Sequence, residues 1–140
     1  MSAISTIYQG QLRTLVTHNP SGAQIFTDAP IDNRGNGEAF SPTDLFVASL
    51  GSCILTIAGI AAESHGFSID GARIETQKVM AQNPRRVGEI ILDIYLPPNN
   101  YTDREKRLIE NAAATCPVTQ SLHPDIKKVV KFLYQEEASI

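Results

Sequence analysis

The sequence predicts an α+β protein in a single domain of residues 1–140. Segments with β-sheet character occur at the start of the chain, directly after its one long helical segment, and at its end. This order predicts helices that pack against a sheet. The composition, 42% apolar and 19% charged over 140 residues, is ordinary for a soluble globular protein with one hydrophobic core. The expected order is three strands, a helix, two strands, two helices and a strand.

The first part of the chain, residues 5–30, is expected to form a β-meander. Residues 6–8, 12–17 and 24–27 are rich in β-branched and apolar side chains, and turn-forming residues separate the second run from the third. Residues 32–37 contain two glycines and two asparagines, a composition typical of a loop.

A long central helix is expected over residues 42–65. Ser41 can cap its N-terminus, Pro42 suits the first helical position, and Asp44 can reach back to the cap and complement the helix dipole. Gly66 supplies the C-terminal stop.

The stretch 45–62 within this helix has no charged residue, which raises the question of a membrane span. Small and polar residues inside the stretch, and the acidic residues Asp44 and Glu63 beside it, argue against a span and against a membrane partner. A helix that is apolar on every face in a soluble protein is expected to be central and fully buried.

The second half of the chain is expected to contain a hairpin, two helices and a last strand. Alternating apolar residues predict that one face of the hairpin belongs to the core. Thr102 and Glu105 stand at the spacing of a capping box, and a helix ends at Cys116 because it precedes a proline. The expected bounds are 72–95 for the hairpin, 103–115 and 117–122 for the helices, and 128–134 for the strand.

Charge and residue types exclude several classes of function. The net charge of −3, without a stripe of Lys and Arg, argues against a nucleic-acid partner. The N-terminus lacks the pattern of an export signal, so a cytoplasmic location is expected. The three histidines are isolated in the sequence, so we expect neither a metal nor a bound cofactor, and a Cys–His hydrolase would lack its orienting partner.

Two cysteines are the leading candidates for chemistry. Cys53 lies midway along the uncharged helix, where a cysteine is usually a small apolar residue. Cys116 precedes Pro117 at the edge of a new helix, where free N–H groups favour a thiolate, although a small buried residue would also suit that corner. In a reducing compartment such a pair is either reactive or simply buried, rather than a structural disulfide.

Four motifs, with Ala48 and Ser121-Leu122, occur together along this chain: TDAP at 27–30, SPTDL at 41–45, GSC at 51–53 and CPV at 116–118. This combination resembles the OsmC/Ohr family of osmotically inducible and organic hydroperoxide resistance proteins, over nearly the whole chain. The resemblance implies an OsmC-like fold, in which antiparallel sheets wrap around two long central helices in an intertwined homodimer. Two active sites would then lie at the subunit interface.

The resemblance also implies a two-cysteine peroxidase that reduces organic or lipid hydroperoxides in oxidative stress defence. Cys53 would be the peroxidatic thiolate that becomes a sulfenic acid, and Cys116 would resolve it as an intramolecular disulfide. An external dithiol, such as a lipoyl-type reductant, would then restore both thiols.

The chain departs from the family pattern at Thr43, where classical members place a glutamate that pairs with an activating arginine. Asp44 is adjacent, but one residue turns about 100° around a helix, so helix capping is the stronger interpretation of Asp44. Arg13 is the first candidate for the activating arginine and Arg34 the second, and an ordinary surface arginine is the alternative for each.

Two other functions remain open at this point. The chain could be an OsmC-like binding protein for an apolar small molecule at the dimer interface, with the cysteines as lining. It could also be a thiol redox sensor that signals through its disulfide. A Cys53→Ser variant that still binds its ligand would indicate the first, and oxidation without multiple turnovers would indicate the second.

Overall fold

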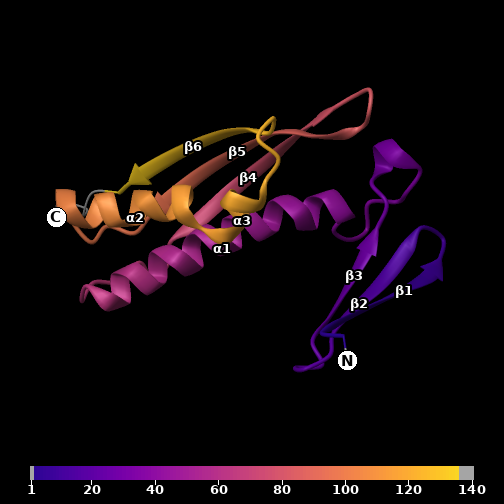
Figure 1. Ribbon diagram of the computed structural model, residues 1–140, viewed down its shortest axis with the longest axis horizontal. Coiled ribbons are helices and arrows are strands. Elements are labelled where there is room, and N and C mark those ends of the chain that lie inside the picture. The colour runs from indigo at the N-terminus through magenta and orange to yellow at the C-terminus, as the bar shows by residue number, and fades with distance from the viewer. Residues whose placement is uncertain (1, 136–140) are drawn as a thin grey trace. The chain divides into compact units, whose positions relative to one another are not determined.

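The computed structural model describes residues 2–135 and has the α+β architecture that the sequence predicts (Figure 1). Its contacts divide the chain into two compact units, Met1–Phe46 and Val47–Ile140. The single domain predicted for 1–140 therefore stays a prediction, and its residues 1 and 136–140 lie outside the described part. The elements are β1 Ile4–Gly10, β2 Arg13–His18, β3 Gln24–Asp28, η1 Ile31–Asn33, α1 Pro42–Ser64, β4 Arg73–Ala81, β5 Arg86–Leu96, α2 Asp103–Thr115, α3 Pro117–Ser121 and β6 Lys127–Tyr134.

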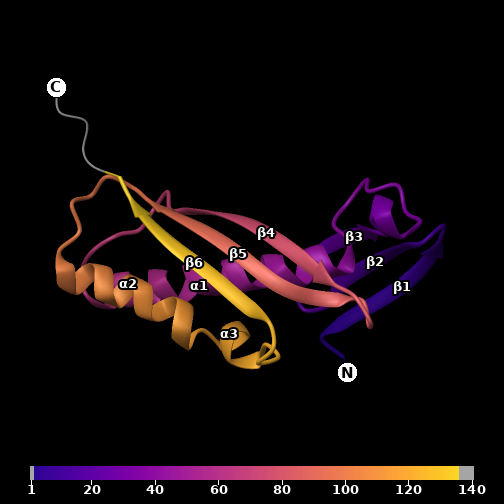
Figure 2. The same cartoon turned by 90° about the horizontal axis from the view of Figure 1, so that it is seen from above.

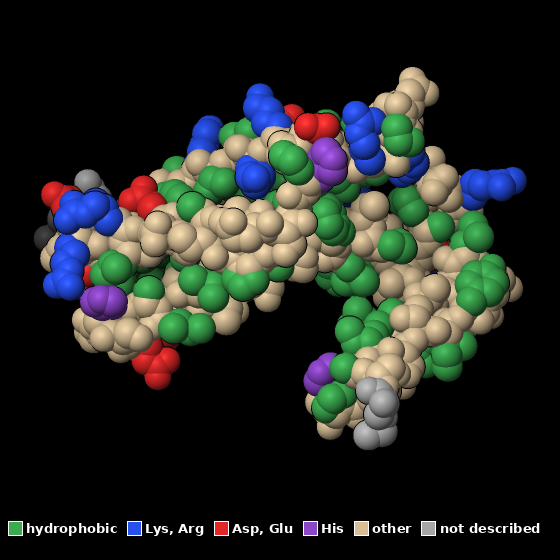
Figure 3. Space-filling model, in the orientation of Figure 1, with side chains coloured by type: hydrophobic (Ala, Val, Ile, Leu, Met, Phe, Trp, Pro, Cys, Tyr) green, Lys and Arg blue, Asp and Glu red, His purple; other side chains and the backbone are tan. Residues whose placement is uncertain are grey.

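The first unit is a three-stranded antiparallel sheet in the order β1–β2–β3, which corresponds to the expected meander. Arg13 at the start of β2 pairs in register with Asp28 at the end of β3. Large apolar side chains of this sheet are exposed, including Tyr8 at 64% and Phe26 at 56%, and apolar groups gather on its surface (Figure 3). A thin sheet without a second layer cannot bury them within the unit.

The loop after β3 is tight where residue 35 passes the backbone of Ala29. A Cβ atom at Gly35 would stand 1.7 Å from the Ala29 carbonyl oxygen, so only glycine fits there. The Gly35 N–H donates to the Pro30 carbonyl at 3.0 Å and closes the turn. This turn sets the path of the chain towards Glu38.

Helix α1 begins and ends at the residues that local rules favour. The Ser41 hydroxyl accepts from the Asp44 N–H at 3.1 Å, and the Asp44 carboxylate accepts from the Ser41 N–H at 2.9 Å. These two residues form the reciprocal cap expected of them. At the other end Gly66 has a φ of +76°, and the Phe67 N–H donates to the Ala62 carbonyl at 3.0 Å. Both features are typical of a glycine C-terminal cap.

Within a single chain α1 is not buried on every face, and its full burial by a second copy stays a prediction. Ile60 is 55% exposed and Phe46 is 40% exposed. By length and composition α1 would suffice to cross a membrane, but central helices of soluble proteins pass the same test. Of its most apolar 18-residue stretch, 33% is buried. One sheet can cover only one face of a helix, so a single chain leaves the rest uncovered. The buried residues are Val47, Leu50, Gly51, Ile54, Ala58 and Ala62.

The second unit contains the sheet β4–β5–β6, and its last pairing corrects the prediction of purely antiparallel sheet. Strands β4 and β5 form an antiparallel hairpin, whereas β5 and β6 run parallel. The connection from β5 to β6 contains α2 and α3, and such a long helical crossover returns the chain to the same end of the sheet. The helices of the unit lie on one face of this sheet (Figures 1 and 2).

The core of the second unit lies between this sheet and its helices. On β5 the even positions from Ile90 to Leu96 are buried, as the predicted alternation requires. They belong to one cluster with Leu50 and Ile54 of α1 and Ile109 of α2. Because Cys53 is on α1 and packs partly against this cluster, the core holds the middle of that helix in place.

Candidate functional site

The two cysteines meet within the second unit. Cys53 comes from the middle of α1, and Cys116 comes from the junction of α2 and α3. The side chain of Cys116 hydrogen-bonds to the Cys53 thiol, and both cysteines are free thiols. Cys53 is half-buried, whereas Cys116 is fully buried with 0% exposure. The sequence places each residue on its element, but only the packing of α1 against the α2–α3 junction brings the sulfurs together.

The first turn of α3 donates backbone N–H groups to both sulfurs. Cys116 is the N-cap of α3, and its Sγ accepts from the Thr119 N–H at 3.4 Å. The backbone N–H of Val118 hydrogen-bonds to the Cys53 thiol. Pro117 starts this helix and leaves Cys116 with extended backbone, as expected of a residue before proline. A backbone N–H group of this turn therefore also reaches the Cys53 sulfur, a contact that no sequence pattern indicates.

The protonation of Cys53 is a balance of opposing effects. The Val118 backbone hydrogen bond is the largest single influence and lowers the pKa of Cys53. Burial raises this pKa, and the hydrogen bond and charge of Cys116 raise it further, so that the net shift is upward. The contacts of Cys53 within this chain therefore favour its thiol form, and a cation close to the sulfur would shift the balance towards the thiolate.

Replacing Cys116 by alanine is expected to lower the pKa of Cys53. The substitution removes both contributions of Cys116, each of which raises that pKa, and leaves the Val118 N–H in place. The rate of Cys53 alkylation by iodoacetamide should then reach its half-maximum at a lower pH than in the native chain. Mass spectrometry of the Cys53 peptide would follow the reaction, and an unchanged or higher midpoint would contradict the assigned role of Cys116.

The Thr119 side chain is a third member of this site that the sequence analysis missed. Its Oγ1 lies 2.9 Å from Cys116 Sγ and donates to the Ala113 carbonyl at 2.7 Å. The sequence does contain a signal for Thr119, because it follows the cysteine of the Cys-Pro pair by three residues. At that spacing the first turn of a helix brings the hydroxyl back to the N-cap residue.

Arg13 lies in the first unit and is held there by two carboxylates. It forms an ion pair with Glu38, and its Nη2 lies 3.8 Å from Asp28 Oδ2. The hydrogen bond and charge of Glu38 raise the pKa of Arg13 further, so this residue stays cationic. Asp28 is only 1% exposed, and its Oδ2 also accepts from the Glu38 N–H at 3.0 Å.

These carboxylates are functional candidates that sequence reasoning did not select. Asp28 belongs to the TDAP motif at 27–30, and its place opposite Arg13 follows only from the β2–β3 register. Arg13, Asp28 and Glu38 together line a pocket of about 320 Å³ in this unit. Asp28 and Glu38 are the acidic partners of Arg13, a role that the uncharged Thr43 side chain cannot take.

The other two predicted site residues have different surroundings. Arg34 is exposed and ends η1 with a left-handed φ of +74°. The carboxylate of Asp44 is hydrogen-bonded at the cap of α1. A catalytic role of Asp44 therefore stays an untested prediction beside an observed structural role. Within residues 2–135, no cluster of three or more His, Cys, Asp or Glu could hold a metal ion.

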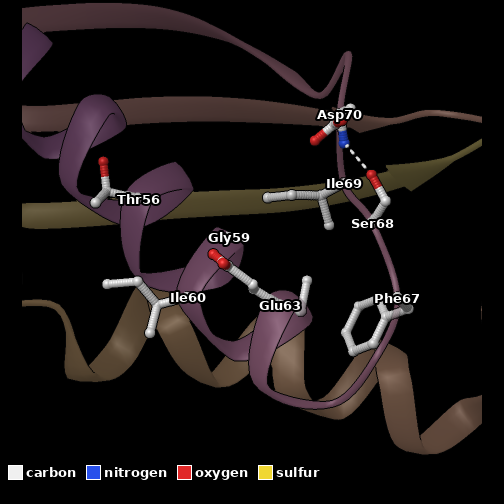
Figure 4. A pocket seen from close by; sticks show the side chains of 9 residues that line it. Thr56, Gly59, Ile60, Glu63, Phe67, Ser68, Ile69 and Asp70 are labelled. Carbon is white, nitrogen blue, oxygen red and sulfur yellow. Dashed lines mark hydrogen bonds between the residues drawn. The ribbon is translucent and has the colours of Figure 1, made fainter.

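A separate pocket of about 370 Å³ lies at the C-terminal half of α1 (Figure 4). Thr56, Ile60 and Glu63 line it from the helix, and Phe67 and Asp70 line it from the segment that follows. Neither cysteine lines this pocket. It is therefore distinct from the thiol pair.

Comparison with known proteins matches most of this chain to one family. Residues 35–131, a segment that includes both cysteines, match the family model described as OsmC-like protein. A search of curated proteins returned no match.

Solved structures agree with this assignment. A protein of Psychrobacter arcticus, described as a putative osmotic stress induced and detoxification response protein, is 47% identical with a TM-score of 0.90, over 94% of this chain and 96% of that chain. An OsmC-like protein from Mycoplasma pneumoniae is 19% identical with a TM-score of 0.78, over 94% of both chains. An organic hydroperoxide resistance protein from Elizabethkingia anophelis is 18% identical with a TM-score of 0.75, over 96% and 98%. The chain therefore belongs to the OsmC-like protein family.

Proposed function

We propose that this protein is a two-cysteine peroxidase that reduces organic hydroperoxides to alcohols in oxidative stress defence. The observation that carries the proposal is the contact between the Cys53 and Cys116 thiols within one chain. Two adjacent thiols can accept one peroxide oxygen and convert it to water by forming a disulfide. Membership of the OsmC-like family, which includes structures named organic hydroperoxide resistance proteins, supports a role in peroxide chemistry.

The proposed cycle has three steps. The Cys53 thiolate attacks the terminal oxygen of ROOH, an S–O bond forms as the O–O bond breaks, and the alkoxide takes a proton to leave as ROH. Cys116 then attacks the Cys53 sulfur of the sulfenic acid, an S–S bond forms, and hydroxide leaves as water with the proton of Cys116. An external dithiol of the lipoyl type reduces the disulfide by exchange and becomes oxidised itself.

Arg13 is the residue that we assign to thiolate stabilisation. The pKa of Cys53 is raised within its own unit, so the first step requires a cation that favours the thiolate. Arg13 stays charged and is oriented by Glu38 and Asp28, instead of by the glutamate that classical family members carry at the position of Thr43. The proposal thus transfers the orienting carboxylates from the helix to the first unit, where Asp28 ends β3 and Glu38 lies in the loop that follows.

A homodimer in the cytoplasm completes the proposed function. The exposed apolar side chains Phe46 and Ile60 of α1, together with Tyr8 and Phe26 of the first unit, are more than a monomer usually leaves in water. A second copy that covers them would give the intertwined arrangement with two central helices that the family resemblance implies. A cytoplasmic location fits a cycle that returns to the dithiol state.

Thiol counting after one equivalent of cumene hydroperoxide tests this function. The expected result is loss of both thiols, a Cys53–Cys116 disulfide in the peptide map, and recovery of both thiols on adding dithiol for further rounds. Two thiols that stay free would contradict the peroxidase and favour a binding protein for an apolar ligand. A disulfide that forms once and does not support turnover would instead favour a redox sensor.

A further inference from the structure

A directed chain of hydrogen bonds starts at the thiol pair and ends at α2. The Cys53 thiol is hydrogen-bonded to the Cys116 side chain. Cys116 Sγ lies 2.9 Å from Thr119 Oγ1, and the Thr119 hydroxyl donates to the Ala113 carbonyl at 2.7 Å. Hydroxyl and thiol groups have one hydrogen each, which settles the direction of every bond.

The direction follows from the Ala113 carbonyl, which can only accept. The Thr119 hydrogen is used in this bond, so Thr119 Oγ1 is the acceptor of the Cys116 S–H. The hydrogen of Cys116 therefore points towards Thr119 and away from Cys53. This leaves lone-pair density of Cys116 Sγ on the side of Cys53, where a nucleophilic attack on Cys53 requires it.

We propose that Thr119 is a positioning residue for disulfide formation, because its hydroxyl orients the Cys116 thiol for attack on Cys53 and then stabilises the Cys116 thiolate. The inference rests on the proposed function insofar as the oxidised Cys53 is a sulfenic acid. When Cys116 loses its proton, the Thr119 hydroxyl turns from Ala113 to donate to the sulfur. A hydrogen bond to a charged acceptor is stronger than the neutral one that it replaces.

The step balances without a further reactant. The S–S bond between Cys116 and Cys53 forms while the S–O bond of the Cys53 sulfenic acid breaks. The Cys53 sulfur is reduced and the Cys116 sulfur is oxidised by the same amount. The proton of Cys116 and the departing hydroxide combine to water, and Thr119 is unchanged at the end.

The test measures the attack of Cys116 directly, with dithiobis-nitrobenzoate as the probe. Half-buried Cys53 reacts first and releases one coloured thiolate, and fully buried Cys116 then displaces the second from the mixed disulfide. The rate of the second release reports the attack by Cys116 without any peroxide. A parallel reaction with cumene hydroperoxide and dimedone measures how fast the Cys53 sulfenic acid forms and disappears.

Three variants separate the role of the hydroxyl from that of shape. Thr119→Val keeps the branched shape, and the second release should slow by roughly 10- to 100-fold, the range expected for a lost hydrogen bond to a charged group. Thr119→Ser keeps the hydroxyl and should stay within about 3-fold of the native rate, well below that loss. Thr115→Val removes a matched threonine hydroxyl, which donates to the Asn111 carbonyl at 2.9 Å, and should react like the native chain.

The outcomes distinguish this proposal from the peroxidase itself. A Thr119→Val variant with the native rate of second release, or a Thr119→Ser variant as slow as Thr119→Val, would overturn the role of the hydroxyl. Slowing by Thr115→Val to the same extent would overturn it too, because general destabilisation of α2 would then be the cause. If cumene hydroperoxide produced neither a sulfenic acid nor a Cys53–Cys116 disulfide in the native chain, this would contradict the peroxidase alone, since the release rates still decide the role of Thr119.

Discussion

Replacing Cys53 by serine is expected to reduce the consumption of cumene hydroperoxide on the order of 10⁴-fold or more. Cys53 is the proposed nucleophile, and a serine hydroxyl in its place stays protonated and cannot attack the peroxide oxygen. The steady-state rate with a dithiol reductant in excess is the measurement. A variant with a rate near that of the native protein would contradict the peroxidase and leave the thiol pair without a catalytic role.

The matched control is Cys116→Ser at the other sulfur of the pair. This variant should still consume one equivalent of hydroperoxide and accumulate a Cys53 sulfenic acid, which dimedone would trap, because only the resolving thiol is missing. If Cys116→Ser accumulated no sulfenic acid while Cys53→Ser did so at Cys116, the roles of the two cysteines would be reversed. The half-buried position of Cys53 and the full burial of Cys116 support the assignment made here.

Replacing Arg13 by glutamine is expected to lower the rate of Cys53 oxidation roughly 100-fold, the loss typical of one electrostatic group that stabilises developing charge. Arg13 carries the charge that the proposal requires, and glutamine removes it while it keeps a polar side chain. Rapid mixing of reduced protein with cumene hydroperoxide, followed by counting of Cys53 thiols, measures this step alone. The melting temperature of the variant should be recorded, because the buried Asp28 loses its cationic partner.

Arg34→Gln is the matched control, since Arg34 is the other candidate arginine and is exposed at the end of η1. Cys53 in the Arg34→Gln variant should be oxidised at the native rate. The rate of Cys53 oxidation in Asp28→Asn should lie between those of Arg13→Gln and Arg34→Gln, because this change removes one of the carboxylates that orient Arg13 and leaves Glu38. Loss of rate in Arg34→Gln with a native rate in Arg13→Gln would exchange the roles of the two arginines.

Most elements of this fold could be predicted because their limits depend on neighbours in sequence. Ser41 and Asp44 cap α1, and Thr102 with Glu105 forms the capping box of α2, each through bonds between residues three apart. The position of Cys116 between two helices follows in the same way from the proline after it. Such signals act over one turn of chain, so they can be read without knowing the rest of the fold.

One expectation about the fold was wrong and another stays a prediction, because both depend on distant partners. The parallel pairing of β6 with β5 depends on where the crossover through α2 and α3 returns the chain. The residues of β6 themselves do not indicate the direction of this pairing. The exposure of Ile60 and Phe46 depends on how much of α1 one sheet can cover. An apolar pattern shows that a helix face needs a partner, but the partner can belong to the same chain or to another.

The sequence by itself determined the order and limits of the elements, the family motifs and the two cysteines as the residues to examine. Only the tertiary structure decided that Cys53 meets Cys116, that Val118 and Thr119 hydrogen-bond to these sulfurs, and that Asp28 and Glu38 hold Arg13. The physical reason is the range of the interactions. Caps and turns form between near neighbours, whereas a thiol pair or an ion pair requires packing and strand register to bring distant residues together.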